Sequence, residues 1–232
     1  MNANARPATL LIEIGTEELP PKALDTLAEA FAKGVVEGLE KCGIAIDAAH
    51  ATVACSPRRL AVLVPGVAHE QPDQSIERRG PAISAALDAS GEPTRALTGF
   101  AASCGVDVAS LERLETDKGA WFVHRALQAG QSTAQLLPAI VEEAVKALPI
   151  PKPMRWGDHE FSFVRPVHWL VVLHGAEVVP GKLFGLEFGR QSRGHRFHHA
   201  GPVHIADADS WMDALRNAKV LADPAERRRR IV

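Results

Sequence analysis

Cationic and aromatic residues alternate in one short segment of the sequence, and that combination is suited to binding RNA. The segment opens with Lys152-Pro153-Met154-Arg155-Trp156-Gly157 and continues through Arg165 to His168-Trp169. An Arg side chain contacts phosphate, while a flat aromatic ring can stack on a base. Aromatic side chains also belong to hydrophobic cores, where they usually lie. We therefore select Lys152, Arg155, Trp156 and Arg165 as candidate RNA contacts, with a structural role as the alternative for Trp156.

Three other predicted turns carry pairs of arginines. Arg193 and Arg196 lie on either side of Gly194, and glycine lets a backbone approach a ligand closely or take a positive φ. The other two pairs are Arg58-Arg59 and Arg78-Arg79. Each turn alone could be an ordinary solvated loop. Together, in a chain with 18 Arg and only 8 Lys, they favour an anionic partner, because a guanidinium group suits bidentate phosphate contact.

A histidine cluster, His195, His198 and His199, lies next to Arg196. A zinc site usually includes a Cys or acidic ligand at a matching spacing, and the sequence supplies none nearby. We therefore expect no metal site. The cluster is expected at the surface, where His195 is a further candidate RNA contact, or buried in a structural role.

Two adjacent carboxylates, Glu17 and Glu18, precede Pro20-Pro21. Adjacent side chains do not converge on one point without help from the fold, and acidic residues favour a helix N-terminus. We expect them to cap a helix. The sequence also lacks the GxxxxGK[ST] loop, a GxGxxG motif that opens a helix, and the GxSxG motif. We predict no catalytic residue and no cofactor site in this chain.

The charge of the chain is unevenly distributed, although the formal net charge is only −2. Residues 1–150 carry 13 basic and 19 acidic side chains, whereas residues 151–232 carry 13 and 9, with seven of the ten His. The net charge therefore does not exclude RNA. With 232 residues, of which 46% are hydrophobic, the chain can bury a core and is not wholly disordered.

The first 67 residues are predicted to form a strand, a helix and two further strands. A β-rich run covers residues 9–14, and apolar residues at helical spacing predict a helix from Pro20 to about Cys42. Strands follow at 51–55 and 59–67. This order is typical of an α/β layer.

The middle of the chain is predicted to hold a small helix-hairpin module around residues 81–128. A polar linker at 68–80 precedes the module. The module itself has a short helix at 81–88, a helix at 95–104, and strands at 111–115 and 120–127 around Asp117-Lys118-Gly119. A helix from Ser132 to about Leu148 follows it.

A stiff linker punctuated by Pro149, Pro151 and Pro153 marks the point where the charge balance changes. The elements expected after it are strands at 167–173, 177–184 and 203–205, a helix at 207–216, and a helix that Asp223 caps. We predict an α+β fold with mixed or antiparallel sheet layers covered by helices, in two lobes at 1–148 and 149–232. Strands at the two ends of the chain could instead pair in one sheet.

The last predicted helix runs into the end of the sequence without a C-cap, so we expect the chain to continue beyond residue 232 in a longer protein. Three widely spaced cysteines, Cys42, Cys55 and Cys104, suggest reduced thiols and a cytoplasmic location. No apolar stretch approaches the roughly 20 residues that span a bilayer, and we expect no membrane partner.

Six blocks of sequence, in order, resemble one known family. They are Leu11–Lys22 (LIEIGTEELPPK), Ser56–Ala61 (SPRRLA), Gly91–Thr94 with Gly99–Ala101, Met154–Gly157 (MRWG), Phe163–Trp169 (FVRPVHW) and Gly194–Phe197 (GHRF). Together they resemble the N-terminal part of the β subunit of bacterial glycyl-tRNA synthetase, and they cover about residues 9–230.

The resemblance implies an α2β2 enzyme that joins glycine to its tRNA using ATP. The α subunit carries the class II active site, so ATP and glycine are expected there. The β subunit mostly handles tRNA, and contact with the acceptor arm is the natural expectation for its N-terminal part. The implied partners of this chain are the α subunit, a second β subunit and tRNA(Gly). The resemblance transfers no catalytic residue to this stretch.

Two other roles remain open. The chain could be mainly a subunit-interface scaffold, with the apolar run Trp169–Leu173 and the acidic helix at 20–42 facing another subunit. It could also be an independent hydrolase that uses Glu17, Glu18 or the histidine cluster, but no sequence signature supports that role.

Overall fold

The computed structural model describes residues 6–88, 90–116, 119–150 and 152–232. The chain forms two compact units. The larger unit comprises Met1–Gln71 and Gln131–Val232, and the smaller unit comprises Pro72–Gly130. The smaller unit is therefore inserted into the larger one along the sequence, and the expected division at residue 148 does not coincide with the observed one. The predicted linker residue Pro151 lies outside the described residues.

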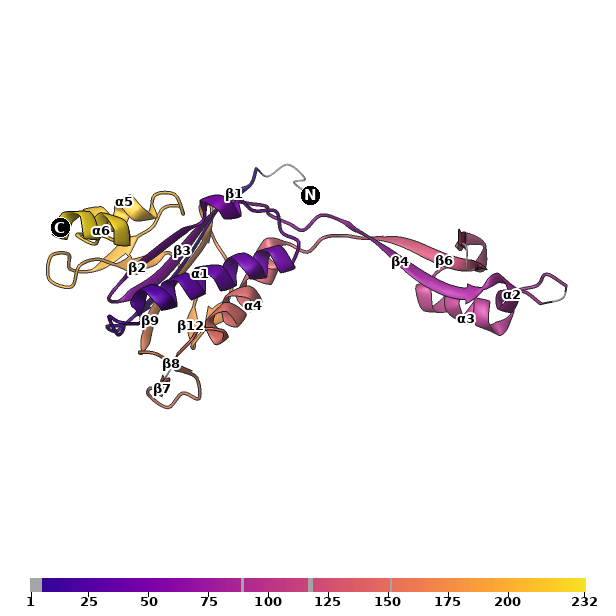
Figure 1. Ribbon diagram of the computed structural model, residues 1–232, viewed down its shortest axis with the longest axis horizontal. Helices are drawn as coiled ribbons and strands as arrows, with labels where there is room; N and C mark the ends of the chain where they lie inside the picture. Colours follow the sequence, from indigo (N-terminus) through magenta and orange to yellow (C-terminus); the bar gives the residue numbers. More distant parts are fainter. Residues whose placement is uncertain (1–5, 89, 117–118, 151) are drawn as a thin grey trace. The chain divides into compact units, whose positions relative to one another are not determined.

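The larger unit is built on a five-stranded antiparallel sheet with β1 at its centre (Figure 1). From edge to edge its strands are β10 (Glu177–Val178), β9 (Val167–His174), β1 (Ala8–Thr16), β3 (Arg59–Val67) and β2 (Thr52–Ser56). The pairing of β1 with β9 runs from Leu10 opposite His174 to Thr16 opposite Val167. Strands from both ends of the chain thus share one sheet, and the change in composition near residue 150 is not a structural boundary.

Helices α1 (Leu24–Lys41) and α4 (Thr133–Lys146) cover one face of this sheet (Figure 1). Alternate side chains of a strand point to opposite faces. Leu10, Ile12 and Ile14 of β1 therefore lie on the same side, and they are fully buried with Phe31 and Val35 of α1. The two helices predicted from apolar spacing are both confirmed.

The opposite face of the sheet carries α5 (Trp211–Asn217). Its core includes Leu11 of β1 and Trp169 of β9, packed with Trp211 and Leu215. The single acidic side chain of β1, Glu13, lies on this face as well, because it is two residues from Leu11. A buried charge in this position needs partners from the surrounding elements.

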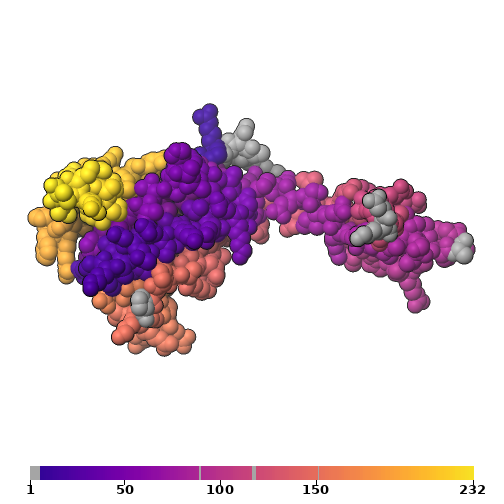
Figure 2. Space-filling view, in the orientation of Figure 1, coloured from indigo at the N-terminus to yellow at the C-terminus, as the bar shows by residue number. Residues whose placement is uncertain are grey.

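The last helix, α6 (Pro224–Ile231), contacts β2 at the edge of the sheet. The Asp223 side chain accepts a 2.8 Å hydrogen bond from the amide of Ala225, so the predicted N-cap is confirmed. The amide of Cys55 in β2 donates to the carbonyl of Ala222 just before the helix. In the space-filling view the yellow C-terminal segment lies against indigo and purple N-terminal segments (Figure 2).

Short elements complete the larger unit. They are η1 (Ala48–His50), β7 (Met154–Arg155), β8 (Ser162–Phe163), β11 (Lys182–Leu183), β12 (Leu186–Glu187), β13 (Gln191–Arg193) and β14 (Pro202–His204). The single strand predicted at 177–184 is wrong, since β10 and β11 are separate and pair with different strands. Pro180 lies between them, and proline cannot donate a ladder hydrogen bond.

The smaller unit has a three-stranded antiparallel sheet in the order β4 (Gln74–Ala82), β6 (Gly119–Gln128) and β5 (Glu112–Thr116). It also contains α2 (Ile83–Ala86), α3 (Arg95–Cys104) and η2 (Val108–Ser110). The predicted polar linker at 68–80 is wrong, because β4 pairs with β6. The strand reads as a linker because most of its side chains are exposed. Asp117 and Lys118 of the predicted turn lie outside the described residues.

The fold class is the expected one, α+β with antiparallel sheets and covering helices. Within the described ranges, no helix combines the length and the apolar character needed to cross a membrane.

Candidate nucleic-acid interface

A buried carboxylate lies at the centre of the larger unit's second core. Glu13 is 0% exposed, and both of its carboxylate oxygens accept hydrogen bonds. Its Oε1 accepts from Arg59 Nη1 at 3.0 Å and from Trp169 Nε1 at 3.0 Å. The same oxygen accepts from Ser192 Oγ at 2.6 Å, and Oε2 accepts from Trp211 Nε1 at 2.7 Å. The charge is thus held by one cation and three neutral donors, which a buried carboxylate needs.

Arg59 uses its guanidinium inside the protein. It is 2% exposed, and besides the ion pair with Glu13 its Nε donates to Ser56 Oγ at 3.1 Å. Its Nη2 donates to the backbone carbonyl of Arg193 at 2.6 Å. Burial lowers the pKa of Arg59, and the Glu13 carboxylate opposes that shift. The side chain selected from the sequence as an RNA contact is therefore placed where it cannot reach a phosphate at the surface.

The Glu13–Arg59 network joins five elements at one point: β1, β3, β9, β13 and α5. Because Arg59 holds the Arg193 carbonyl, the network determines where the chain leaves β13 and enters the loop 194–199. Gly15 is required beside it, since a Cβ at that position would lie 1.8 Å from Cε2 of Trp169. The Trp169 ring packs directly on this glycine and keeps its indole N–H toward Glu13.

The loop that follows β13 is held by its own hydrogen bonds. The His195 amide donates to the Ala218 carbonyl at 2.8 Å, and the His199 amide donates to the His195 carbonyl at 3.0 Å. The ring Nδ1 of His195 accepts from the amides of Phe197 at 3.2 Å and His198 at 3.3 Å. His195 is thus half-buried and structural, while Phe197 is 82% exposed.

A groove of about 480 Å³ runs beside this loop. Its basic lining residues come from three places in the sequence and are Arg58, Arg59, Arg193, His195, Arg196, Lys219 and Arg227. Among the described lining residues, Glu18 is the one that is acidic. Arg193 and Lys219 are exposed and have no side-chain hydrogen bond or ion pair within the described parts of the chain. The groove therefore carries an excess of positive charge that an anionic ligand could neutralise.

Glu17 and Glu18 pair with basic side chains at one end of this groove. Arg58 Nη2 lies 3.3 Å from Glu17 Oε1, and Arg196 Nη1 lies 3.4 Å from Glu18 Oε1. His168 Nε2 lies 2.9 Å from Glu17 Oε1. A hydrogen bond from its own backbone, supported by Arg58 and Arg196, lowers the pKa of Glu18. The Arg196–Glu18 pair is exposed and contributes little stability, so a phosphate can replace it at small cost, whereas the Arg58–Glu17 pair is half-buried.

The helix-capping role predicted for Glu17 and Glu18 is wrong. Helix α1 begins at Leu24 and its N-cap position is Ala23, several residues beyond the two carboxylates. The Glu17 amide instead donates to the Pro166 carbonyl at 3.0 Å, and the Leu19 amide donates to the Pro57 carbonyl. The two residues form a loop beside the start of β3.

The candidate residues at 152–165 lie in different environments. Arg165 is exposed, and its Nε donates to the Glu18 carbonyl at 3.1 Å, which places it near the groove. Trp156 is half-buried, with its ring 5.1 Å from the ring of Phe161 and 5.9 Å from that of Phe184, measured between centroids. Its structural role is thus the one the structure favours. Lys152 and Arg155 are exposed.

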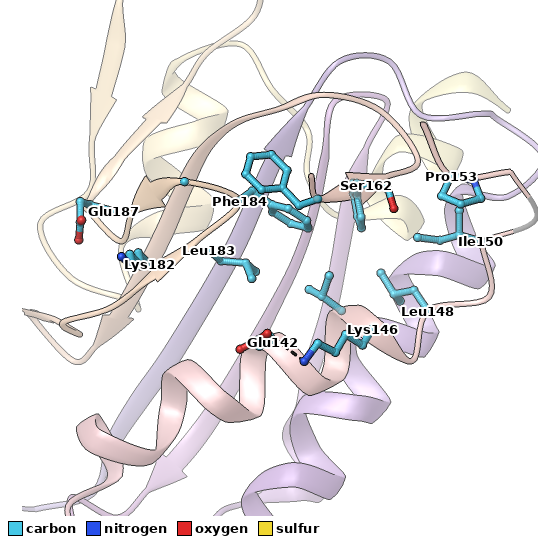
Figure 3. A pocket seen from close by; sticks show the side chains of 14 residues that line it. Glu142, Lys146, Leu148, Ile150, Pro153, Ser162, Lys182, Leu183, Phe184 and Glu187 are labelled. Carbon is cyan, nitrogen blue, oxygen red and sulfur yellow. Dashed lines mark ion pairs between the residues drawn. The ribbon is translucent and has the colours of Figure 1, made fainter. Parts of the chain in front are cut away.

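A second hollow, of about 870 Å³, lies between α4 and the segments around β8 and β11 (Figure 3). Its charged lining residues balance, two acidic and two basic: Glu142 and Lys146 on α4 form an ion pair at 2.9 Å, and Lys182 and Glu187 line the other side. Its floor includes apolar side chains such as Leu148 and Leu183. This balance of charge suits a polyanion less well than the Arg-rich groove does.

Arg78 and Arg79 belong to the smaller unit, where both are exposed on β4. Arg78 Nη1 donates to the Ser103 carbonyl at 2.9 Å. The Arg79 guanidinium lies 3.7 Å from the ring centroid of Trp121, a cation–π contact. The two side chains are therefore engaged within their own unit.

Several residues of the groove and of the network behind it were not predicted from the sequence, with Glu13, Phe197, Lys219 and Arg227 among them. Glu13 had a detectable signal, because it is a charge within the apolar run Leu10–Ile14. Phe197 stands in a quoted motif, but its exposure could not be foreseen. Lys219 had no local signal, and Arg227 stands in a run of four arginines that is expected to be a solvated helix face; only the fold brings the two beside Arg193.

The larger unit thus combines an α+β fold with an Arg-rich groove and an exposed aromatic side chain. A family model described as "Glycyl-tRNA synthetase beta subunit" matches residues 10–232. The chain therefore belongs to the glycyl-tRNA synthetase beta subunit family.

Its relatives include proteins named "Glycine--tRNA ligase beta subunit" from three bacteria. The Xanthomonas campestris pv. campestris (strain B100) protein is 56% identical over 223 residues, which are 96% of this chain and 32% of the relative. The Chromohalobacter salexigens protein is 55% identical over 222 residues, again 96% and 32%. The Hahella chejuensis protein is 54% identical over 219 residues, 94% and 31%. The chain thus spans about a third of the length of these relatives and corresponds to their N-terminal part.

Proposed function

We propose that this chain is the part of a glycine–tRNA ligase β subunit that grips the backbone of tRNA(Gly) through the Arg-rich groove. The observation that carries the proposal is the convergence of Arg58, Arg193, Arg196, Lys219 and Arg227 on one groove. In this proposal ATP and glycine bind to the α subunit, which does the chemistry. The complete enzyme works in the cytoplasm and contains a second β subunit.

The electrostatics of the groove support this function. Phosphate contacts supply most of the sequence-independent affinity for RNA, since each one releases condensed counterions. Arg193 and Lys219 are free to make such contacts at once. Arg196 can exchange its exposed carboxylate partner for a phosphate, while Arg58 lines the groove half-buried beside Glu17. The acidic remainder of the chain does not oppose binding strongly, because charges beyond about 8–10 Å are screened at physiological salt.

The test is the salt dependence of tRNA(Gly) binding by the full-length enzyme and by this chain, with Arg193→Ala and Arg196→Ala combined. The double variant is expected to bind more weakly, and its logarithmic salt slope should fall by about 1–2 units, at somewhat under one unit per lost contact. Arg228→Ala with Arg229→Ala is the matched control, because it removes the same charge from exposed positions of α6 outside the groove lining. Equal effects of the two double variants on binding and on charging would contradict the proposal.

One of the two surfaces named for the alternative role, a subunit scaffold without RNA contact, is buried. The run Trp169–Leu173 lies within β9 and is buried in the sheet, which does not favour a contact of this run with another subunit. The apolar side of α1 packs against the sheet and α4, but its acidic side chains, such as Glu29 and Glu37, are exposed and remain available to another subunit. Co-purification with the α subunit tests this role directly. Retained α binding by the Arg193/Arg196 double variant, with lost tRNA binding, would separate the two functions.

A further inference from the structure

Phe197 is the most exposed aromatic side chain that the described residues present beside the groove, at 82%. We propose that its ring is a platform on which an unpaired base of the RNA stacks. The inference rests on the proposed function, and it narrows the ligand from RNA in general to RNA with a single-stranded nucleotide at the groove.

Hydrogen bonds within the turn that contains Phe197 keep its side chain exposed. Two amides of the turn, those of Phe197 and His198, donate to the ring Nδ1 of His195. The His195 amide is tied in turn to the Ala218 carbonyl at 2.8 Å, next to α5. Gly194 allows the turn to close, since a Cβ there would lie 2.6 Å from the His199 ring. The ring is therefore presented outward by a hydrogen-bonded turn, and it is preorganised to receive a ligand.

The surroundings of the ring match a nucleotide, which is flat at one end and anionic at the other. The Arg196 guanidinium lies 5.9 Å from the Phe197 ring centroid, and the groove lined by Arg193 and Lys219 adjoins the same turn. A phosphate bound by these cations leaves the attached base close to the aromatic ring. Proteins that bind single-stranded RNA without sequence preference combine a basic groove, which follows the RNA backbone, with aromatic side chains on which the bases stack.

The geometry separates an unpaired nucleotide from a paired one. In a duplex both faces of each internal base are covered by neighbouring bases, and the bases lie inside the helix. Only a base at an end, in a bulge or in a loop can offer a free face to Phe197. The groove alone recognises phosphates in any RNA, so Phe197 is the residue that would make binding selective for a single strand.

The experiment compares Phe197→Ala with Phe197→Trp in the full-length enzyme and in this chain. The probes are a fluorescent single-stranded RNA oligonucleotide and a blunt RNA duplex of the same length. A stack on one base is worth about 1–3 kcal/mol, so Phe197→Ala should weaken single-strand binding about 5- to 150-fold. Duplex binding should change less than about twofold, and Phe197→Trp should keep the single-strand affinity because it keeps the stacking face. Leu127→Ala is the control, since Leu127 is 76% exposed in the smaller unit.

Each remaining outcome overturns the proposal in a distinguishable way. If Phe197→Ala binds the single strand normally while the Arg193/Arg196 double variant loses tRNA, the platform is wrong and the groove stands. If neither variant changes binding, the proposed function fails as well. If Phe197→Ala lowers the affinity for the single strand and for the duplex equally, Phe197 has a structural role. Loss of α-subunit association with unchanged RNA affinity assigns the ring to a protein contact.

Discussion

The indole Nε1 of Trp211 donates a 2.7 Å hydrogen bond to Oε2 of Glu13, across 198 positions of sequence. The bond joins the central strand of the larger unit to the helix that covers its second face. Arg59, Trp169 and Ser192 donate the other hydrogen bonds to this buried carboxylate, so its donors come from distant parts of the sequence. Arg59 also donates a hydrogen bond to the backbone carbonyl of Arg193. The buried ion pair therefore fixes the position of a backbone segment that lines the basic groove.

The first prediction concerns the buried ion pair itself. Glu13→Ala leaves the Arg59 guanidinium buried without its carboxylate, and breaking a buried pair in this way costs about 3–5 kcal/mol. The free energy of unfolding, measured by urea titration, should fall by that amount. Glu37→Ala is the control, because its pair with Lys33 is exposed and should change the value by less than about 1 kcal/mol. Similar losses for both variants would refute a special role for Glu13.

The second prediction concerns the contact between Gly15 and Trp169. A Cβ at residue 15 would overlap the indole ring, so Gly15→Ala must displace Trp169 and weaken its hydrogen bond to Glu13. Overpacking of this kind costs about 1–3 kcal/mol or more in unfolding free energy. Gly99→Ala, on α3 with no atom within 4 Å of the added Cβ, should instead be neutral or stabilise by up to about 1 kcal/mol. Thermal unfolding of the two variants checks the difference, and a harmless Gly15→Ala would count against the packing described here.

The third prediction concerns the pH dependence of stability. Burial lowers the pKa of His174 below its ordinary value of 6.5, and its Nε2–H donates to the Val67 carbonyl at 2.9 Å. The unfolded chain therefore binds a proton at this residue before the folded protein does. The stability contributed by neutral His174 is fully present above the ordinary pKa and is lost as the pH falls through the folded pKa.

The measurement is the urea midpoint of the protein and of His174→Gln between about pH 8 and about pH 5. The decline in stability toward low pH should be shallower in the variant. His204→Gln, at an exposed position on β14, serves as the control and should keep the slope of the unaltered protein. Parallel curves for the protein and His174→Gln would show that another group causes the acid sensitivity.

The fourth prediction concerns the attachment of α6. Arg227 Nη1 donates to the carbonyls of Cys55, Leu221 and Ala222, so this side chain ties the helix to β2. Burial raises the pKa of Cys55, although Arg227 opposes the shift, and the thiol should react slowly with an alkylating reagent. Cys42 and Cys104, which are half-buried, should react faster.

Arg227→Met should speed the labelling of Cys55, as measured by mass spectrometry of its peptide. Loss of the cation by itself would raise the pKa of the thiol further and slow the reaction, so a faster rate reports that α6 has separated from β2. Arg230→Met is the control, because Arg230 pairs with Glu226 on the exposed side of the helix. An unchanged Cys55 rate in Arg227→Met would mean that other contacts hold the helix.

Much of the local structure was accessible from the sequence because it depends on local patterns. Apolar residues at helical spacing predicted α1 and α4, and Asp223 with Pro224 marked the start of α6. Strand β4 escaped prediction because its exposed side chains resemble those of a linker, and only pairing with β6 shows it to be a strand.

The sequence by itself determined the family, through six ordered blocks, and predicted a site rich in arginines. It could not separate Arg58 from Arg59, because neighbours have the same local signals whichever way they point. The tertiary structure decided that the Arg59 guanidinium is buried on Glu13, while Arg58 is only half-buried and pairs with Glu17 beside the groove. Burial and charge pairing arise between residues far apart in sequence, such as Glu13 and Trp211. For that physical reason the site can be seen only in the tertiary structure, where β1, β13 and α5 lie side by side.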